Sequence, residues 1–281
     1  MKVAIIGYGF VGKALKNCLK SDVDTFLVDP KINTDISDLN SFVPDIIFVC
    51  VPTPMNDDGS QDISILQKVM KKLRQFSYSH IVLKSTLLPN HFDKMEKIIP
   101  NLIYNPEFLR EKFANEDFIN SELIIFGGKK ISTDILAKFY KNHTKCINKK
   151  YHHTDLATAS LIKYSINSFL ATKVTFFNEL YNLFNESKSE DTWENIIKII
   201  SVDKRIGNSH MQVPGHDGML GFGGPCLPKD CKALYIYSNE INKPMSLLNQ
   251  VILTNNNIRK NYNHLTEREL EQNINYNNHE E

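Results

Sequence analysis

The sequence predicts an α/β fold, with a doubly wound, mostly parallel sheet in its first half and an all-α second half. Up to about residue 150, short apolar segments alternate with amphipathic ones, which is typical of strands joined by crossover helices. Beyond that point, residues 156–185 contain neither glycine nor proline, which indicates one long helix. We therefore expect one domain at residues 1–150, a helical domain at 151–262, and a polar, frayed tail at 263–281.

The first half contains several predicted strands with helices between them. Strands are expected at residues 3–6, 26–28, 45–51, 81–84, 102–104 and 123–126, and helices at 10–20, 62–74, 91–98 and 133–142. Polar residues follow three of the strands: Thr53, then Ser85 with Thr86, then Glu107 with Glu111. Each alone is typical of a helix cap or a turn. Because ligands of doubly wound sheets bind beyond the carboxyl ends of the strands, the repetition indicates a lined cleft.

The first predicted strand leads directly into the sequence GYGFVG, which places Gly7, Gly9 and Gly12 in the G-x-G-x-x-G frame. A helix candidate follows, and the second strand ends in Asp29, about 20 residues beyond the first glycine. This combination predicts a dinucleotide-binding Rossmann domain, with the pyrophosphate at the helix N-terminus. Asp29 is expected to accept both ribose hydroxyls, which favours NAD over NADP, although nearby Lys31 weakens that preference.

Composition excludes several classes of protein. The 281 residues carry a formal net charge of +1, which favours neither a nucleic-acid nor a membrane partner, and the longest apolar runs are too short to span a bilayer. The start has a lysine before apolar residues, but it lacks the sustained apolar core of a secretory leader. The five cysteines (18, 50, 146, 226 and 231) are odd in number and form no CxxC pair, so we expect reduced thiols, a cytoplasmic protein and no metal site.

The long helix of the second half carries polar residues among apolar ones. Thr154–Asp155 is the predicted cap, and Lys163 and Asn167 stand four residues apart on one face. A lysine in such surroundings either snorkels to the surface or is held for a purpose. A second helix is expected near residues 192–201. A last one, from about Pro244, is either core or a subunit seam.

The segment Gly221–Asp230, GFGGPCLPKD, is the most informative of the second half. It places Cys226 between a glycine cluster and Pro228, close to Lys229 and Asp230. A thiolate attacks carbonyl carbon well, and a flexible glycine stretch lets backbone close over a ligand. The alternative is a glycine-rich loop that holds a small buried cysteine.

With these pieces assembled, the chain resembles the nucleotide-sugar 6-dehydrogenases, the family of UDP-glucose and GDP-mannose 6-dehydrogenases, and most closely its UDP-glucose members. The matching segments are GYGFVG (7–12), Asp29, VPTPMNDDGSQD (51–62), VLKSTLLP (82–89), NPEFLRE (105–111), KYSINSFLATKVTFFNE (163–179), KRIG (204–207) and GFGGPCLPKD (221–230). The resemblance implies two successive NAD-dependent oxidations at C6 of a nucleotide sugar, from UDP-glucose to UDP-glucuronate.

The resemblance also implies a role for each matched residue. Cys226 would trap the C6 aldehyde as a thiohemiacetal, and its oxidation would give a thioester that water hydrolyses. Lys163 and Asn167 would hydrogen-bond the oxygen on C6, as hydroxyl and then as oxyanion. Asp230, near Lys163 in the family arrangement, would keep that amine charged and orient water.

Further roles follow from the resemblance. Glu107 would act as a base toward the hydrolytic water, and Thr86 would position water or cofactor. The cofactor would be lined by Phe10, Val11, Thr53, Thr86 and Glu111, in addition to the glycine turn with Asp29 and Lys31. The sugar nucleotide would contact Glu107, Phe108, Leu109, Arg110, Lys163, Asn167, Phe222 and Gly223. Arg205 resembles an arginine that reaches the substrate across a homodimer interface.

Several departures from the family pattern affect these expectations. Lys112 and Lys204 stand where glycine and proline are common, and residues 210–220 form a longer insertion before the cysteine segment. Members of the family normally continue into another α/β domain that grips the uridine diphosphate, which this sequence is expected to lack. The chain would then bind substrate weakly, use a separate polypeptide for that domain, or act on a smaller alcohol. Alternatives are a GDP-mannose or other UDP-sugar dehydrogenase, and a non-catalytic NAD-binding subunit that needs a partner chain.

Overall fold

The structure, a computed structural model, describes residues 1–262 and 264–276. The chain forms two compact units. The first, here called the sheet unit, comprises Met1–Thr53 and Asp62–Lys163, and the second, the helical unit, comprises Pro54–Gln61 and Tyr164–Glu281. The predicted division between residues 150 and 151 stays a prediction. Among the described residues, none of the helices combines the length and the apolar character that crossing a bilayer requires.

The sheet unit is built on a seven-stranded sheet in the order β2-β1-β3-β4-β5-β6-β7 within the described residues. The strands are β1 (Lys2–Ile6), β2 (Asp24–Val28), β3 (Ile46–Val49), β4 (His80–Leu83), β5 (Ile103–Tyr104), β6 (Ile125–Gly127) and β7 (His152–Thr154). Neighbours are parallel except β5 and β6. Edge strand β7 is absent from the sequence prediction because its residues, HHT, are polar and partly exposed, and therefore give no apolar signal.

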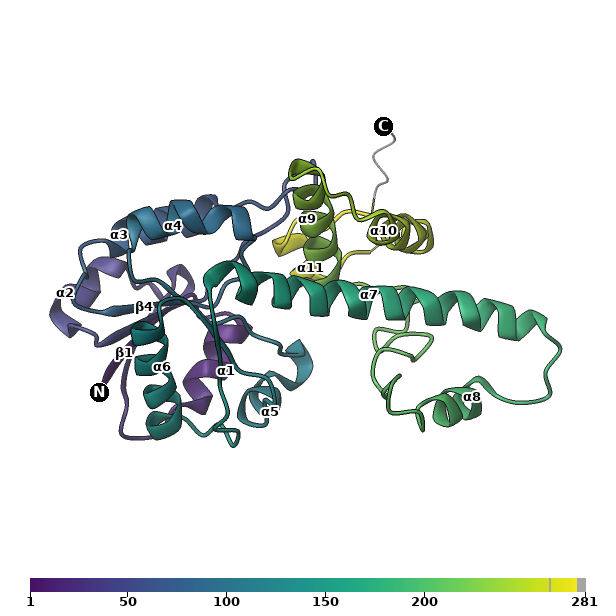
Figure 1. Ribbon diagram of the computed structural model, residues 1–281, viewed down its shortest axis with the longest axis horizontal. Helices are drawn as coiled ribbons and strands as arrows, with labels where there is room; N and C mark the ends of the chain where they lie inside the picture. The colour runs from purple at the N-terminus through teal and green to yellow at the C-terminus, as the bar shows by residue number, and fades with distance from the viewer. Residues whose placement is uncertain (263, 277–281) are drawn as a thin grey trace. The chain divides into compact units, whose positions relative to one another are not determined.

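Helices cover both faces of this sheet, which confirms the doubly wound prediction (Figure 1). Alternate side chains of β1 enter opposite cores, as the period of two in a strand requires. Val3 and Ile5 pack with α1 (Phe10–Cys18), α5 (Ala114–Ile119) and α6 (Lys130–His143). Ala4 and Ile6 belong to the other core, with α2 (Leu39–Phe42), α3 (Ser64–Leu73) and α4 (Phe92–Ile98). Short 3₁₀ turns lie at Pro30–Ile32, Ile36–Asp38, Pro89–His91 and Glu111–Phe113.

The predicted long helix is α7 (Leu156–Glu186), and it begins where the sequence indicated. The Asp155 side chain accepts the backbone N–H of Thr158 at 2.8 Å, which satisfies a donor in the first turn. Near its start the helix packs tightly on β6, because a Cβ added at Gly127 would lie 2.8 Å from that of Ala159. The helix therefore carries Lys163 from a rigid attachment to the sheet.

The helical unit adds α8 (Trp193–Ile200), α9 (Leu227–Glu240), α10 (Ser246–Arg259) and α11 (Glu267–Glu271). Trp193 and Phe177 form a small core with Met211 and Val213. The sequence prediction missed α9 because glycines and a proline precede this helix and a second proline lies in its first turn. Pro228 lies in the first turn, where a missing N–H costs no intrahelical bond. Cys226 therefore sits directly at the N-terminus of a helix.

The expected frayed tail is wrong for residues 264–276. Thr266 and Glu269 form a capping box at the start of α11, each side chain accepting the other's backbone N–H. Two distant residues, Met55 and Gln272, are joined by a backbone hydrogen bond of 3.0 Å. The remainder of the predicted tail, residues 263 and 277–281, lies outside the described residues.

Candidate functional site

The glycine turn between β1 and α1 leaves an open surface at the helix N-terminus. Gly7 has a φ of +91°, and a Cβ there would lie 2.6 Å from the Cys50 carbonyl oxygen. A Cβ on Gly12 would lie 2.2 Å from the Gly7 oxygen, so helix and turn pack closely at that position. Around Gly9, by contrast, no described atom lies within 4 Å of such a Cβ, and this residue caps α1 without a side-chain bond. An exposed helix N-terminus with this free approach fits a pyrophosphate group.

Asp29 lies beside this turn, at the end of β2. One carboxylate oxygen accepts the N–H of Tyr8 at 2.7 Å and the other accepts the N–H of Lys31 at 2.8 Å. These two bonds fix the orientation of the carboxylate next to the glycine turn, where a ribose would lie in a dinucleotide site. The Lys31 residue is exposed, and Phe10 and Val11, in the first turn of α1, are half-buried.

These contacts predict opposite consequences for two alanine substitutions. Gly12→Ala should lower the free energy of unfolding by roughly 1–3 kcal/mol, because backbone must move to admit the methyl group. Gly9→Ala should leave stability unchanged, yet weaken NADH binding about tenfold or more, since the methyl group would occupy the approach of the pyrophosphate. Thermal unfolding and a fluorescence titration with NADH measure the two effects. Wild-type affinity in Gly9→Ala would contradict this placement of the cofactor.

The loops after β3 and β4 are tied together. The buried Thr53 hydroxyl donates to the carbonyl oxygen of Thr86 at 3.0 Å, and the Ser85 hydroxyl donates to that of Val51 at 2.6 Å. Thr53 and Thr86 thus come together at the carboxyl edge of the sheet, as expected. Their proposed contacts with the cofactor or with water stay predictions.

Lys163 and Glu107 also come together, both buried within the sheet unit. The Lys163 amine donates to the Glu107 carbonyl oxygen at 2.6 Å and lies 3.4 Å from its carboxylate. The other carboxylate oxygen accepts the N–H of Leu109 at 2.6 Å. With only 3% of its surface exposed, Lys163 does not snorkel, so that alternative is wrong. The amine also lies 5.2 Å from the ring of Phe108.

A neighbouring buried network was missed by the sequence reasoning. The Lys84 amine donates to the side-chain oxygen of Asn105 at 2.9 Å, and the Tyr140 hydroxyl donates to the same oxygen at 2.5 Å. Burial lowers the pKa of Lys84. The available signal was a lysine directly after the apolar residues of β4. Because Asn105 precedes Glu107 by two residues, this network orients the segment that carries Glu107.

Some predicted contact residues have other partners. Arg110 forms a two-pronged ion pair with Asp117, with distances of 2.7 and 3.0 Å, and this arginine holds the pKa of the Asp117 carboxyl below its usual range. Arg205 pairs in the same manner with Asp203, and its side chain is 89% exposed. Glu111 is exposed at the start of a 3₁₀ turn. The roles of Arg110, Glu111 and Arg205 stay predictions.

In the helical unit, Asn167, Asp230 and Lys229 form a buried cluster near the first turn of α9. The carboxylate of Asp230 accepts the Asn167 amide at 2.6 Å and the Lys229 amine at 2.6 Å. Cys226 is half-buried and occupies the N-cap position of α9, where the helix dipole favours a negative charge. This setting differs from that of Cys231, one turn further along, where burial raises the thiol pKa to about 12.

Side chains from distant helices hold the glycine-rich turn that leads to Cys226. The N–H of Gly221 donates to Asn178 at 2.8 Å, and Asn255 both accepts from and donates to the backbone of Phe222, at 2.7 and 2.9 Å. Arg259 donates to the Gly221 carbonyl oxygen at 2.9 Å. Phe222 is buried, and a Cβ on Gly223 would lie 2.7 Å from Arg259. Sequence reasoning missed Asn178, Asn255 and Arg259, whose only signal was a polar residue in an apolar helix.

The fold and these residues define a class: a dinucleotide-binding α/β unit joined to a helical unit that presents a cysteine at a helix N-terminus. The chain belongs to the UDP-glucose/GDP-mannose dehydrogenase family. The model of its NAD binding domain matches residues 30–144, and the model of its central domain matches residues 157–257. Together they cover more than half of the chain, and residues 30–144 are therefore part of the family's NAD-binding domain.

Individual relatives agree with this assignment. The chain is 39% identical over 197 residues to a UDP-glucose 6-dehydrogenase of Rickettsia bellii, covering 67% of this chain and 44% of that protein. It is 30% identical to a putative UDP-glucose 6-dehydrogenase of Bacillus subtilis, YtcA, and the match covers 89% of this chain and 66% of that protein. The chain thus spans about half to two thirds of the length of these curated relatives.

Solved structures show the same fold. A UDP-glucose dehydrogenase from Pyrobaculum islandicum superposes with a TM-score of 0.75 at 24% identity, covering 92% of this chain and 68% of that chain. A GDP-mannose dehydrogenase from Pseudomonas aeruginosa gives a TM-score of 0.64 at 24% identity, covering 92% and 69%.

Proposed function

We propose that this protein oxidises the C6 hydroxyl of a nucleotide sugar to a carboxylate, with UDP-glucose as substrate and UDP-glucuronate as product. The observation that carries the proposal is the placement of Cys226 at the start of α9, in a turn held by buried side chains. Membership of the family, with its NAD-binding domain, supplies the reaction class. When bound, NAD⁺ accepts the hydride in each of the two oxidations.

In the proposed mechanism, Cys226 forms the covalent intermediates. The first oxidation converts the C6 alcohol into an aldehyde and releases one proton. The Cys226 sulfur then adds to the aldehyde carbon to give a thiohemiacetal, and its oxidation yields a thioester and a second proton. Water attacks the thioester, the C–S bond breaks, and the acid and the free thiol result. Two NADH are formed for each acid.

Charged and amide groups on α7 would stabilise the oxygen on C6. Lys163 and Asn167 are one helical turn apart, and each is buried. A cation and an amide directed at this oxygen serve it as a hydroxyl and as a tetrahedral oxyanion. Glu107 would accept a proton from the hydrolytic water, and its carboxylate lies 3.4 Å from the Lys163 amine. We propose that Asp230 orients Asn167, to which it is hydrogen-bonded.

A stoichiometric assay tests this function. Purified protein with NAD⁺ and UDP-glucose should yield two NADH for each UDP-glucuronate, followed by absorbance at 340 nm and by chromatography of the sugar nucleotide. One NADH with free aldehyde would contradict the thioester route. Absence of turnover with the isolated chain, and its appearance on mixing with a second polypeptide, would support the alternative of a subunit that needs a partner.

Other nucleotide sugars form the second candidate substrate class. Structural relatives include a GDP-mannose dehydrogenase and a UDP-N-acetyl-mannosamine dehydrogenase of Staphylococcus aureus, the latter with a TM-score of 0.66. The same residues would perform the same chemistry on these sugars. Assays with GDP-mannose and UDP-N-acetylmannosamine beside UDP-glucose decide between them through their kcat/KM values.

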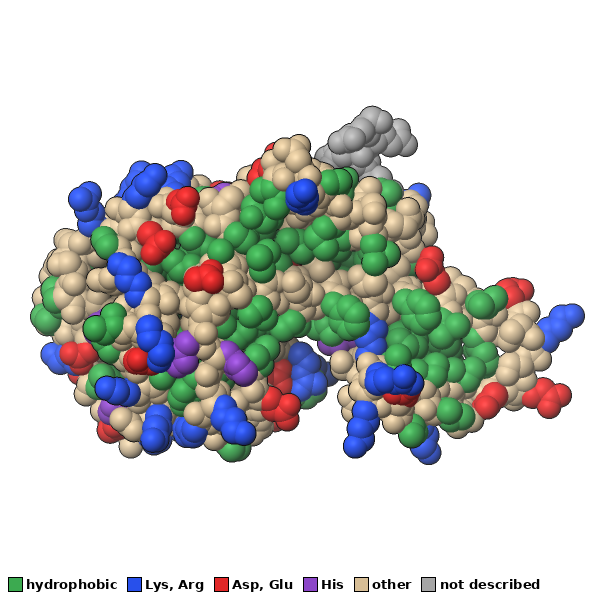
Figure 2. Space-filling model, in the orientation of Figure 1, with side chains coloured by type: hydrophobic (Ala, Val, Ile, Leu, Met, Phe, Trp, Pro, Cys, Tyr) green, Lys and Arg blue, Asp and Glu red, His purple; other side chains and the backbone are tan. Residues whose placement is uncertain are grey.

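We also propose that the protein is a homodimer. Three large apolar side chains of α7, seven residues apart, are exposed: Phe169 by 67%, Phe176 by 58% and Leu183 by 66%. This spacing places them on one stripe of the helix. Apolar side chains also gather over α8 and the adjoining end of α7 in Figure 2. A second copy of the chain covering such a stripe would remove it from water.

The dimer proposal predicts the effect of two charges on this stripe. Phe169→Glu together with Phe176→Glu should convert a dimer into a monomer, because carboxylates cannot be buried there without partners. Sedimentation equilibrium measures the mass. Ile131→Glu is the matched control, since Ile131 is 74% exposed on α6 of the sheet unit. A monomeric wild type, or a dimer that survives both substitutions, would contradict the proposal.

A further inference from the structure

The end of the described chain lies against the turn that leads to Cys226. Here the segment Thr266–Tyr276 is called the C-terminal strap. Its Glu269 carboxylate, 4% exposed, accepts the N–H of Gly224 at 2.9 Å. The same oxygen accepts the Tyr276 hydroxyl at 2.7 Å, and the other oxygen accepts the N–H and the hydroxyl of Thr266, each at 2.8 Å. One buried carboxylate therefore joins both ends of the strap to the glycine turn.

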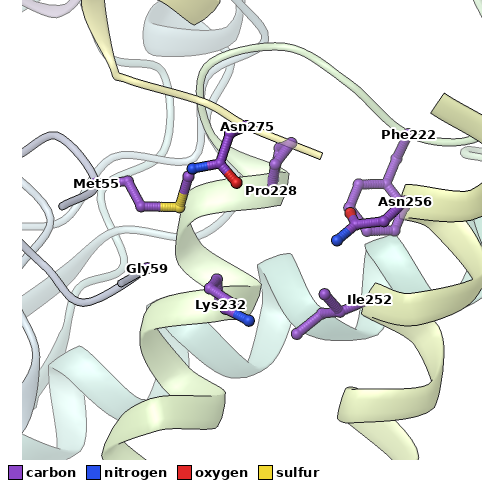
Figure 3. Close-up of a pocket in the computed structure, with 8 residues that line it drawn as sticks. All are labelled: Met55, Gly59, Phe222, Pro228, Lys232, Ile252, Asn256 and Asn275. Atoms are coloured by element: carbon purple, nitrogen blue, oxygen red, sulfur yellow. The ribbon is translucent and has the colours of Figure 1, made fainter. Parts of the chain in front are cut away.

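The strap is also hydrogen-bonded to loop 54–61 of the same helical unit. Gln272 accepts the N–H of Met55 at 3.0 Å, and the Asn273 amide donates to the Met55 carbonyl oxygen at 2.8 Å. Figure 3 shows Asn275 of the strap between Met55 and Pro228, which lies in the first turn of α9. Phe222 lines the same small hollow from its other side. The strap thus connects loop 54–61 to the cysteine turn.

Glu269 is the contact that fixes the turn at Gly224. The α10 side chains Asn255 and Arg259 hold the backbone at residues 221 and 222. Gly224 has a φ of +80°, and no described atom lies within 4 Å of a Cβ built on it, so packing does not restrain this residue. A glycine in open space has many accessible conformations, and a hydrogen bond to a buried carboxylate selects one. Gly224 precedes Cys226 by two residues.

The carboxylate is suited to this task because it stays charged. Burial alone favours the neutral acid, but the N–H donors of Thr266 and Gly224 and the hydroxyl of Tyr276 together hold the pKa of Glu269 below its usual range. The hydrogen bond to Gly224 is therefore present above the carboxyl pKa and is lost only as the pH falls through that lowered value.

We propose that Glu269 is a positioning residue for Cys226: by binding Gly224 from the C-terminal strap, it fixes the turn in the form that presents the sulfur to substrate. The effect on catalysis rests on the proposed function. The effect on the conformation of the turn at Gly224 does not depend on it. Glu269 lies beyond residues 157–257, the part of the chain that matches the model of the family's central domain.

Hydrogen exchange of the full chain tests the contact directly. In Glu269→Ala, the amide of Gly224, followed in overlapping peptides, should exchange about tenfold faster than in the wild type, because it loses its acceptor. Alkylation of Cys226 by iodoacetamide should become several-fold faster, since the half-buried sulfur becomes more accessible. Glu267→Ala is the matched control, because Glu267 is exposed on the same short helix, and it should change neither rate.

Two more variants separate positioning from general damage to the fold. Glu269→Gln keeps an acceptor for Gly224 and should restore most of the protection. Tyr276→Phe removes one donor to the same oxygen and should give an intermediate exchange rate, even if Glu269→Ala proves too unstable to purify. In the assay for NADH formation, Glu269→Ala should lower kcat about tenfold while the KM for NAD⁺ stays within twofold. Glu269→Gln should restore most of the wild-type kcat.

The possible outcomes decide between two separate failures. Unchanged exchange at Gly224 in Glu269→Ala would overturn the contact, and increased exchange with unchanged Cys226 alkylation and kcat would overturn its effect on the cysteine. If the wild-type protein oxidises none of the nucleotide sugars, the proposed function fails. The exchange and alkylation rates then still support or overturn the inference about the turn.

Discussion

Replacing Cys226 by alanine is expected to abolish formation of the acid, with a loss of at least about a thousandfold in its rate. No other step in the proposed reaction retains the aldehyde covalently and gives an oxidisable thiohemiacetal. The substitution removes one sulfur from a turn whose backbone is held by other side chains, so the fold should persist. NADH affinity should remain as in the wild type, because the predicted cofactor contacts lie at the glycine turn of the sheet unit.

Cys231→Ala is the matched control for this experiment. It lies on the same helix, but burial raises its pKa to about 12, so at neutral pH it is a protonated thiol packed in the interior. The control should keep most of the activity. Product chromatography and NADH counting measure both variants. Acid formation at the wild-type rate in Cys226→Ala would end the covalent mechanism.

Lys163→Ala is expected to have the second largest effect, a loss of about 2–4 kcal/mol in transition-state stabilisation, or roughly 30- to 1,000-fold in kcat. The amine is buried and fixed by the Glu107 carbonyl oxygen at 2.6 Å, so it is directed before substrate arrives. Removing it deletes the cation that faces the developing oxyanion. It also removes the amine that lies 3.4 Å from the buried Glu107 carboxylate, so the base loses its charged neighbour.

Two controls distinguish this loss from damage to the structure. Lys163→Met retains most of the side-chain volume, so it avoids the cavity that alanine leaves and should show the same fall in kcat. Lys173→Ala, on the same helix, removes an amine that donates to the Ile206 carbonyl oxygen at 2.9 Å and should leave kcat nearly unchanged. Steady-state kinetics and thermal unfolding provide the readouts. Wild-type kcat in Lys163→Met would refute the assigned role.

The dinucleotide-binding half was predictable because its signals are contiguous. Gly7, Gly9 and Gly12 lie within six residues, and each is required by a local close approach or by an open helix N-terminus. The apolar strands of the sheet core gave equally direct signals. Edge strand β7 and helix α9 were missed, since the first is polar and the second has Pro228 in its first turn and follows the three glycines of the segment Gly221–Asp230.

The environment of the candidate catalytic groups was not predictable in the same way. Asn178, Asn255, Arg259 and Glu269 bind one short glycine turn, yet they are separated from it by more than 30 residues along the chain. Pairings over such distances leave no periodic trace, because hydrophobic patterning reports only which face of an element is buried. For this reason the sequence predicted a frayed tail, whereas in the structure the Glu269 carboxylate accepts four hydrogen bonds that hold the strap in place.

The sequence by itself determined the fold class, the glycine turn before α1 and which cysteine is flanked by glycine and proline, since each depends on neighbouring residues. Only the tertiary structure decided what surrounds these groups: that Lys163 is buried against Glu107, that Asp230 holds Asn167, and that the strap binds Gly224. The physical reason is that burial and hydrogen-bond partners are set by packing between distant segments, where one carboxylate or amine is stable only with the partners that the fold supplies.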